Sequence, residues 1–131
     1  MGTIAALCCP QCGWEAVTED TFACGACSSV LEVRMDLGYL TRSDLRSIRV
    51  KGEPTLWRWF DFFPVKSRSS VVSLGEGYTP LIRCLRLGQH LGMERLYLKN
   101  DTLLPTGSLK DRSNCVGISR AVELGFDTVA V

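Results

Sequence analysis

The residues best suited to chemistry lie in the run from Asn100 to Arg112, which contains a single lysine, Lys110. A proline-glycine turn precedes Ser108, and the four residues from Ser108 to Asp111 have the types of a capping box at a helix start. The first helical turn carries unpaired N–H groups and the positive end of the macrodipole, where an ammonium is disfavoured. We therefore expect a partly desolvated Lys110 that favours its neutral amine, the form that makes Schiff bases. A solvated surface lysine without a role is the alternative.

Four blocks of sequence resemble, in order, segments of the fold-type II pyridoxal-phosphate enzymes. The lysine run is similar to the motif N-P-T-G-S-F-K-D-R, with Leu104 and Leu109 in place of Asn and Phe. Residues 73–81, SLGEGYTPL, resemble the E-G-x-T-P-L segment, and residues 96–101, LYLKND, resemble the strand and turn before the lysine. Residues 57–64, WRWFDFFP, are similar to the lead-in of the threonine synthase branch. Together these blocks cover about residues 54 to 131.

The resemblance implies a role for Lys110 and for the residues around it. Lys110 would hold pyridoxal 5'-phosphate as a Schiff base and, once the substrate amine displaces it, move protons at the substrate carbons. The implied reaction converts O-phospho-L-homoserine and water to L-threonine and phosphate. By motif position, Thr79 and Ser108 line the approach to the lysine, and Asp111 and Arg112 steady the helix start.

Close relatives of this branch share the lysine motif, so the substrate is left open among them. Cysteate synthase, threonine dehydratase and cysteine synthase differ mainly in substrate-pocket residues, most of which would follow residue 131. The W-R-W-F-D-F-F-P lead-in and the cysteine-rich N-terminus favour threonine synthase over the dehydratase and cysteine synthase. They discriminate poorly against cysteate synthase.

The 131-residue length is short for this family, whose glycine loop for the cofactor phosphate and S-x-G-N segment would come later. The last residues, Asp127 to Val131, predict a buried parallel strand because they are short, apolar and β-branched. We therefore expect a truncated N-terminal part of the family fold. Alone, the chain is expected not to be a competent enzyme.

The N-terminal cysteines have the spacing of a metal site. Cys9 and Cys12 form one C-x2-C knuckle, Cys24 and Cys27 form a second, and the short gap between them fits a β-hairpin. Four thiolates satisfy tetrahedral zinc, so we predict a structural zinc ribbon. A degenerate knuckle without metal is the alternative, and Cys8 could substitute for Cys9. Taken alone, this module would equally suggest a non-catalytic zinc ribbon that binds protein or nucleic acid.

The sequence has neither an apolar run of membrane-spanning length nor a signal-peptide pattern, so the cytoplasm is the expected location. Fifteen basic and fourteen acidic side chains nearly cancel, which implies neither a nucleic-acid nor a membrane partner. Residues 41–68 hold seven Lys or Arg among several aromatics, a mixture seen in nucleic-acid binding, but we favour a linker whose aromatics dock on the main domain. The partner expected from the resemblance is a small amino-acid substrate, with a homodimer as the full-length form.

The predicted organisation is an α/β chain in three parts. Residues 1–36 form the zinc-ribbon-like module and 37–70 form a linker and docking segment. Residues 71–131 begin a parallel three-layer αβα unit that binds the cofactor. Alternation predicts a strand at 31–36, and we expect a further strand at 96–99 and helices near 42–48, at 85–91 and at 108–124. In the last of these, Cys115, Ile118 and Val122 share one face. Gly117 inside that helix indicates a close packing contact.

Overall fold

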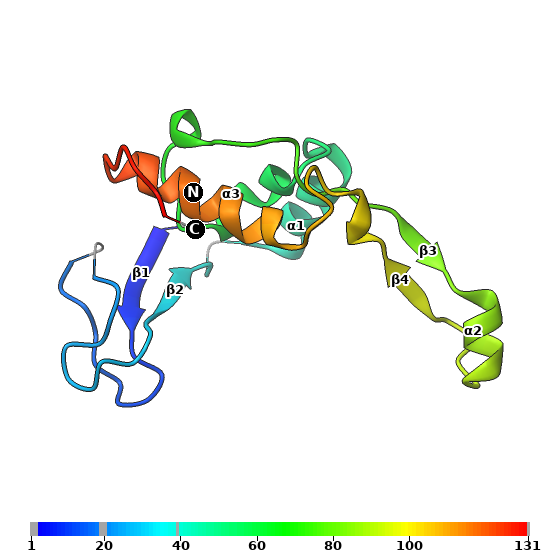
Figure 1. Ribbon diagram of the computed structural model, residues 1–131, viewed down its shortest axis with the longest axis horizontal. Coiled ribbons are helices and arrows are strands. Elements are labelled where there is room, and N and C mark those ends of the chain that lie inside the picture. Colours follow the sequence, from blue (N-terminus) through cyan, green and yellow to red (C-terminus); the bar gives the residue numbers. More distant parts are fainter. Residues whose placement is uncertain (1–2, 19–20, 39, 131) are drawn as a thin grey trace.

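The computed structural model describes residues 3–18, 21–38 and 40–130, which form an elongated molecule with two projections from a central body (Figure 1). One projection is the cysteine-rich N-terminal module, and the other is an arm built from β3, α2 and β4. The central body contains helices α1 (Arg42–Lys51) and α3 (Lys110–Glu123) with the 3-10 helices η1 (Leu56–Phe62) and η2 (Arg68–Ser70). None of the helices in these residues is long and apolar enough to cross a bilayer.

The core lies where the aromatic segment of η1 packs against α3. Trp57, Phe60 and Val65 are buried together with Cys115, and the Trp57 ring meets the edge of Phe63 at 5.6 Å. Removal of these side chains from water is the main stabilising term available to a body of this size. Trp57 and Phe60 therefore dock as the sequence predicts. Burial raises the pKa of the Cys115 thiol to about 11, in keeping with its expected role as a small core residue.

Helix α3 is also tied to the segment before the lysine motif by polar contacts. Ser119, fully buried, accepts a hydrogen bond from the backbone N–H of Val72 at 2.9 Å. Glu123 accepts hydrogen bonds from the backbone N–H groups of Lys66 and Ser67 at 2.8 and 2.6 Å. The buried face of α3 thus contains Asp111, Cys115 and Ser119. Of the predicted face, Cys115 is buried and Ile118 is half-buried, but Val122 is 46% exposed.

The first helix begins at a complete capping box. Thr41 accepts from the N–H of Asp44 at 3.2 Å, and the Asp44 carboxylate accepts from the N–H of Thr41 at 2.8 Å. Two orphan donors of the first turn are satisfied in this way. Helix α1 confirms the short helix expected near residues 42–48 and continues it to Lys51.

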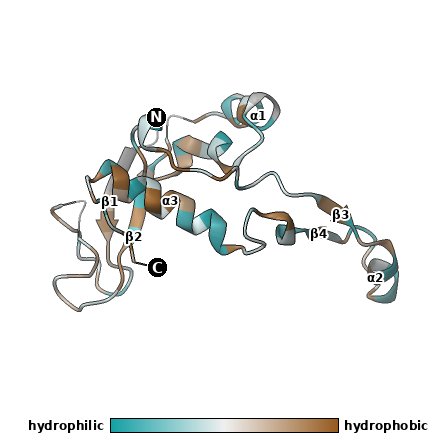
Figure 2. Ribbon diagram, turned by 45° about the horizontal axis from the view of Figure 1, so that its top comes forward, coloured by the Kyte–Doolittle hydropathy of each residue, from teal (hydrophilic) through white to brown (hydrophobic). Residues whose placement is uncertain are grey.

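The arm is an antiparallel pair with a short helix at its tip (Figure 1). Strand β3 (Leu81–Arg83) pairs with β4 (Tyr97–Lys99), and α2 (Leu85–His90) connects them. Both strands are exposed, and hydrophobic residues recur along β3 (Figure 2). The helix predicted at 85–91 and the strand predicted at 96–99 are therefore present. The strand pairs antiparallel with β3, whereas a parallel sheet was expected.

Several expectations of a parallel three-layer unit are wrong for the described residues. The N-terminal strands β1 (Thr3–Cys8) and β2 (Glu32–Asp36) also pair antiparallel, so neither two-stranded sheet contains a parallel neighbour. Residues 127–130 are not a strand, because no second strand lies beside them to accept the hydrogen bonds of a parallel ladder. Val131 lies outside the described residues. The observed class is a small mixed α/β fold, and the boundaries at residues 36 and 70 stay predictions.

Gly117 lies open on α3, contrary to the expected close contact. A Cβ placed there would meet no atom within 4 Å. We therefore expect Gly117→Ala to raise the free energy of unfolding by about 1 kcal/mol, the difference in helix propensity between the two residues. Denaturant unfolding of the variant measures this gain.

Gly88 on α2 provides the matched control. A Cβ there would lie 2.5 Å from the carbonyl oxygen of Met93, so Gly88→Ala is expected to destabilise. A loss of stability in Gly117→Ala would contradict the open environment of that residue.

Candidate functional site

Lys110 is the first residue of α3 and its side chain is exposed. Its backbone N–H donates to the hydroxyl of Ser108 at 3.2 Å, while its Nζ has no hydrogen-bond or ion-pair partner among the residues that the structure describes. The partial desolvation expected from the sequence is therefore absent here. The amine is free to react, because none of the carboxylates in the described residues pairs with it.

The capping box predicted between Ser108 and Asp111 at this helix start is wrong, because Asp111 bonds a different residue. The Asp111 carboxylate is buried and accepts from the backbone N–H of Thr106 at 2.9 Å and from the Thr106 hydroxyl at 2.5 Å. It therefore does not cap Ser108. Instead, Asp111 accepts the hydrogen bonds of Thr106, which lies in the proline-glycine turn. These bonds fix the turn against the first residues of α3.

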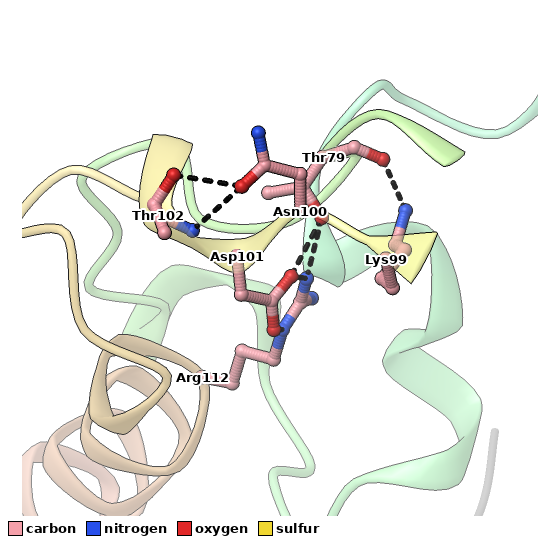
Figure 3. A network of polar contacts seen from close by, with 6 residues as sticks. All are labelled: Thr79, Lys99, Asn100, Asp101, Thr102 and Arg112. Carbon is pink, nitrogen blue, oxygen red and sulfur yellow. Dashed lines mark hydrogen bonds and ion pairs between the residues drawn. The ribbon is translucent and has the colours of Figure 1, made fainter. Parts of the chain in front are cut away.

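A polar network joins the start of α3 to two other segments (Figure 3). Arg112 donates to both carboxylate oxygens of Asp101, at 3.0 and 2.7 Å, and to the hydroxyl of Thr79 at 3.1 Å. The Thr79 hydroxyl donates in turn to Asp101 at 2.7 Å. This bidentate arrangement is geometrically specific, so it fixes the loop at Thr79, the turn at Asp101 and the lysine helix relative to one another.

Two further contacts extend this network. The Lys99 amine donates to the backbone carbonyl of Thr79, so this lysine is occupied where Lys110 is not. The Asn100 side chain accepts from the backbone N–H of Thr102 at 3.3 Å and from its hydroxyl at 2.7 Å (Figure 3). Sequence patterns singled out the block containing these residues but none of their contacts.

The loop before Thr79 is organised around a buried carboxylate, Glu76. It accepts from the Ser73 hydroxyl at 2.5 Å and from the backbone N–H of Leu74 at 2.9 Å, and its own carbonyl accepts from the N–H of Leu56 at 2.5 Å. Gly77 adopts φ +103, and a Cβ there would lie 2.5 Å from the backbone nitrogen of Leu56. The glycine is needed for this close approach between the loop and η1.

The Asp101–Arg112 pair predicts a pH dependence of stability. The hydrogen bonds from Arg112, with that from Thr79, lower the pKa of Asp101 from 3.8 to about 2. A lowered pKa in the folded state stabilises the protein above the unfolded pKa, and this contribution is lost as the pH falls from about 4 through 2. The gap in unfolding midpoint between the unaltered protein and Asp101→Asn is therefore expected to be constant above pH 4 and to close near pH 2.

Denaturant unfolding from pH 2 to 6 measures that gap. Asp127→Asn is the matched control, because Asp127 is exposed and pairs with no cation among the described residues. A gap that persisted undiminished at pH 2 would contradict the role of the Asp101 charge.

The four predicted metal-ligand cysteines are brought together in space. The sulfur atoms of Cys9, Cys12, Cys24 and Cys27 all lie within 4.8 Å of one another, with Cys9–Cys27 and Cys12–Cys24 separations of 3.5 Å. Zn–S bonds of about 2.3 Å place the sulfurs of a tetrahedron about 3.8 Å apart, so the arrangement fits a zinc ion. Cys8 is not in the cluster, since its sulfur faces the carbonyl of Glu32 at 3.8 Å.

The two knuckles have matching backbone hydrogen bonds. In the first, Cys9 N–H donates to the carbonyl of Trp14 and Gly13 N–H donates to that of Cys9, at 2.8 and 2.9 Å. In the second, Cys24 pairs with Ser29 and Ser28 with Cys24 in the same way, both at 2.9 Å. The hydroxyl and backbone of Ser29 lower the pKa of the Cys27 thiol to about 6.

The two knuckles reach the left-handed backbone conformation at residues of different types. Gly13 adopts φ +77 in the first knuckle, but Ser28 with φ +60, not Gly25, takes this conformation in the second. Gly25 instead leaves room for the Trp14 ring, which a Cβ would approach to 3.0 Å. The expected hairpin between the knuckles is also absent from the described residues, where single bridges join Cys8 to Glu15 and Ala23 to Val30.

Two surface grooves lie away from Lys110. One lies between α1 and η1, and another runs over the C-terminal half of α3 beside Pro64 and Phe126. Neither is lined by Lys110 or by the residues of its polar network. The site around Lys110 is thus identified by its free amine and its fixed backbone.

Comparison with known proteins gives consistent matches. Residues 72–131 match the family of pyridoxal-phosphate dependent enzymes. A threonine synthase from Methanocaldococcus jannaschii is 39% identical over 121 residues, covering 92% of this chain and 30% of the relative. That from Methanosarcina acetivorans is 35% identical over 123 residues, covering 93% and 29%. The chain therefore spans less than a third of the length of these relatives. No solved structure matches.

Proposed function

We propose that this chain, whose residues 72–131 match the family of pyridoxal-phosphate dependent enzymes, belongs to that family and forms part of a threonine synthase. The reaction proposed is conversion of O-phospho-L-homoserine and water to L-threonine and phosphate. The two relatives described above align over nearly the whole chain and bear the name threonine synthase, which supports this substrate among those used by the family.

The observation that carries the proposal is the free amine of Lys110 at a helix start that is fixed on two sides. Asp111 holds the preceding turn through Thr106, and Arg112 holds Asp101 and Thr79. A nucleophile held in a fixed position needs less reorganisation to reach its target. We propose that Lys110 binds the cofactor covalently and, when released, takes and returns protons at the substrate carbons.

Pyridoxal phosphate, when bound, supplies an electron sink for the carbanion character that develops at those carbons. The contribution of this chain is the amine and its orientation. Thr79 and Arg112 are positioning residues in this proposal, because they contact Asp101 and each other and hold the lysine helix without touching the amine. Lys99 donates to the Thr79 carbonyl and is therefore engaged, whereas the Lys110 amine is not engaged by any of the described residues.

We propose a second cofactor, a structural zinc ion held by Cys9, Cys12, Cys24 and Cys27. Four thiolates close the coordination shell, so this ion would stabilise the N-terminal module and take no part in the reaction. A cytoplasmic location and a homodimer of the full-length protein are part of the same proposal.

Threonine formation from O-phospho-L-homoserine tests the function. The assay is run with added cofactor on the chain itself and on a chimera that joins it to the remaining C-terminal part of the M. jannaschii threonine synthase. Threonine and phosphate in equal amounts support the proposal. A folded, cofactor-loaded chimera that releases phosphate without threonine, or that consumes threonine by dehydration instead, contradicts it.

A further inference from the structure

A groove of about 870 Å³ lies between α1 and η1, apart from the Lys110 site. Its lining is made of three arginines, one leucine and three aromatic side chains: Arg42, Leu45, Arg46, Arg49, Trp59, Phe62 and Phe63. A volume of this size is in the range of small-molecule sites. No acidic side chain contributes to the lining, so the groove combines positive charge with aromatic surface.

The aromatic run of η1 divides between the core and this groove. Trp57 and Phe60 are buried in the core, whereas Trp59 and Phe62 line the groove and are only half-buried. A kink at Trp59, with φ −99 and ψ 24, interrupts the helical geometry at this point. The docking of aromatics expected from the sequence therefore accounts for only part of the run and leaves a second aromatic surface unexplained.

The two groove aromatics suit a single planar ligand. The Trp59 and Phe62 rings meet edge to face, with centroids 5.9 Å apart and planes inclined by 70°. Because the two rings are steeply inclined to each other, they offer a stacking surface to a single flat group and not the parallel series that successive bases of a strand require.

The three arginines supply the positive charge. They are spaced four and three residues apart on α1, so they follow one face of the helix over about 10 Å. All three are exposed, and no carboxylate pairs with them within the part of the chain that the structure describes. The nearest acid on the same helix, Asp44, is engaged by the Thr41 cap. Guanidinium groups bind phosphate oxygens bidentately and also stack on aromatic faces.

We propose that this groove binds a nucleoside polyphosphate. The base stacks against Trp59 and Phe62, and the phosphate chain extends along Arg42, Arg46 and Arg49. A span of about 10 Å accommodates a short polyphosphate and would contact only about three phosphates of a nucleic-acid strand. An acidic peptide would meet the charge but would leave the half-buried rings without a planar partner.

Calorimetric titration of the chain with ATP tests the proposal. The expected result is saturable binding at one site per chain. Arg46→Gln and Arg49→Gln each remove a charged donor and are expected to weaken binding about tenfold or more. Arg86→Gln is the matched control, because Arg86 is an exposed arginine on α2 outside the groove, and it is expected to leave the affinity within about twofold of the parent.

Two further ligands test the two halves of the site. Inorganic triphosphate lacks the base and is expected to bind at least about fivefold more weakly than ATP, because the stacking contribution is lost. Equal affinity for triphosphate and ATP would overturn the proposal. Loss of affinity in Arg86→Gln equal to that in Arg46→Gln would also overturn it. Tighter binding of a single-stranded oligonucleotide than of ATP would assign the surface to nucleic acid instead.

Discussion

Replacement of Lys110 by alanine is expected to lower threonine formation by at least about a thousandfold. The variant loses both the covalent link to the cofactor and the group that moves protons, each of which contributes orders of magnitude to the rate. The surrounding contacts should survive, because the Lys110 side chain is exposed and its Nζ bonds no other described residue. Steady-state phosphate and threonine release from the chimera defined above measures the loss.

A chemical readout separates this role from a purely structural one. Incubation with pyridoxal phosphate followed by borohydride reduction fixes the cofactor on its lysine, and peptide mass analysis then locates it among the four lysines of the chain. The label is expected on Lys110 and absent from Lys110→Ala. Lys66→Ala is the control and is expected to keep it. Label found mainly on Lys99 or Lys66 would contradict the assignment of Lys110.

Removal of the proposed zinc ion is expected to unfold the N-terminal module. Zinc binding by four thiolates contributes apparent free energies on the order of 10–16 kcal/mol in small zinc modules, which exceeds what a 6-residue and a 5-residue strand can supply. We expect about one zinc per chain after purification without chelators, and a Cys9→Ser variant that retains less than about a tenth of it.

Cys8 is the matched control for this measurement. It is adjacent to Cys9, but its sulfur is directed to the Glu32 carbonyl and lies outside the cluster. Cys8→Ser is therefore expected to keep its zinc. Equal loss of zinc from both variants would contradict the ligand set, and absence of zinc from the unaltered chain under reducing conditions would favour a knuckle that folds without metal.

Local features of the fold were predictable where they depend on neighbouring residues. The helices at 42–51, 85–90 and 110–123 and the strands at 32–36 and 97–99 follow hydrophobic periodicity and turn residues. The capping box at Ser108 failed because Asp111 has a second available partner, Thr106, and sequence spacing does not rank two nearby donors. The parallel pairing failed because strand direction depends on neighbours in the sheet and not on the strand's own residues.

The candidate sites likewise contain one part that could be predicted from neighbouring residues and one part that could not. The clustering of the four cysteines could be predicted, since two C-x2-C knuckles each direct two thiolates to one point. The network of Thr79, Asp101 and Arg112 could not, because it joins residues that are 11 to 33 positions apart. Their types carry no period and no fixed spacing, so only the three-dimensional path of the chain brings them together.

The contacts that Ser119 and Glu123 make with the chain before the lysine motif have a consequence for mutational tolerance. Both side chains accept hydrogen bonds from backbone N–H groups, those of Val72, Lys66 and Ser67. A main-chain donor is supplied by every amino acid except proline. Sequence drift at positions 66 and 72 is therefore compatible with these bonds provided that proline is avoided. Substitution at 119 and 123 is confined to side chains that can reach these N–H groups and accept a hydrogen bond from them. The constraint on sequence therefore falls on helix α3 and not on the segment that it holds.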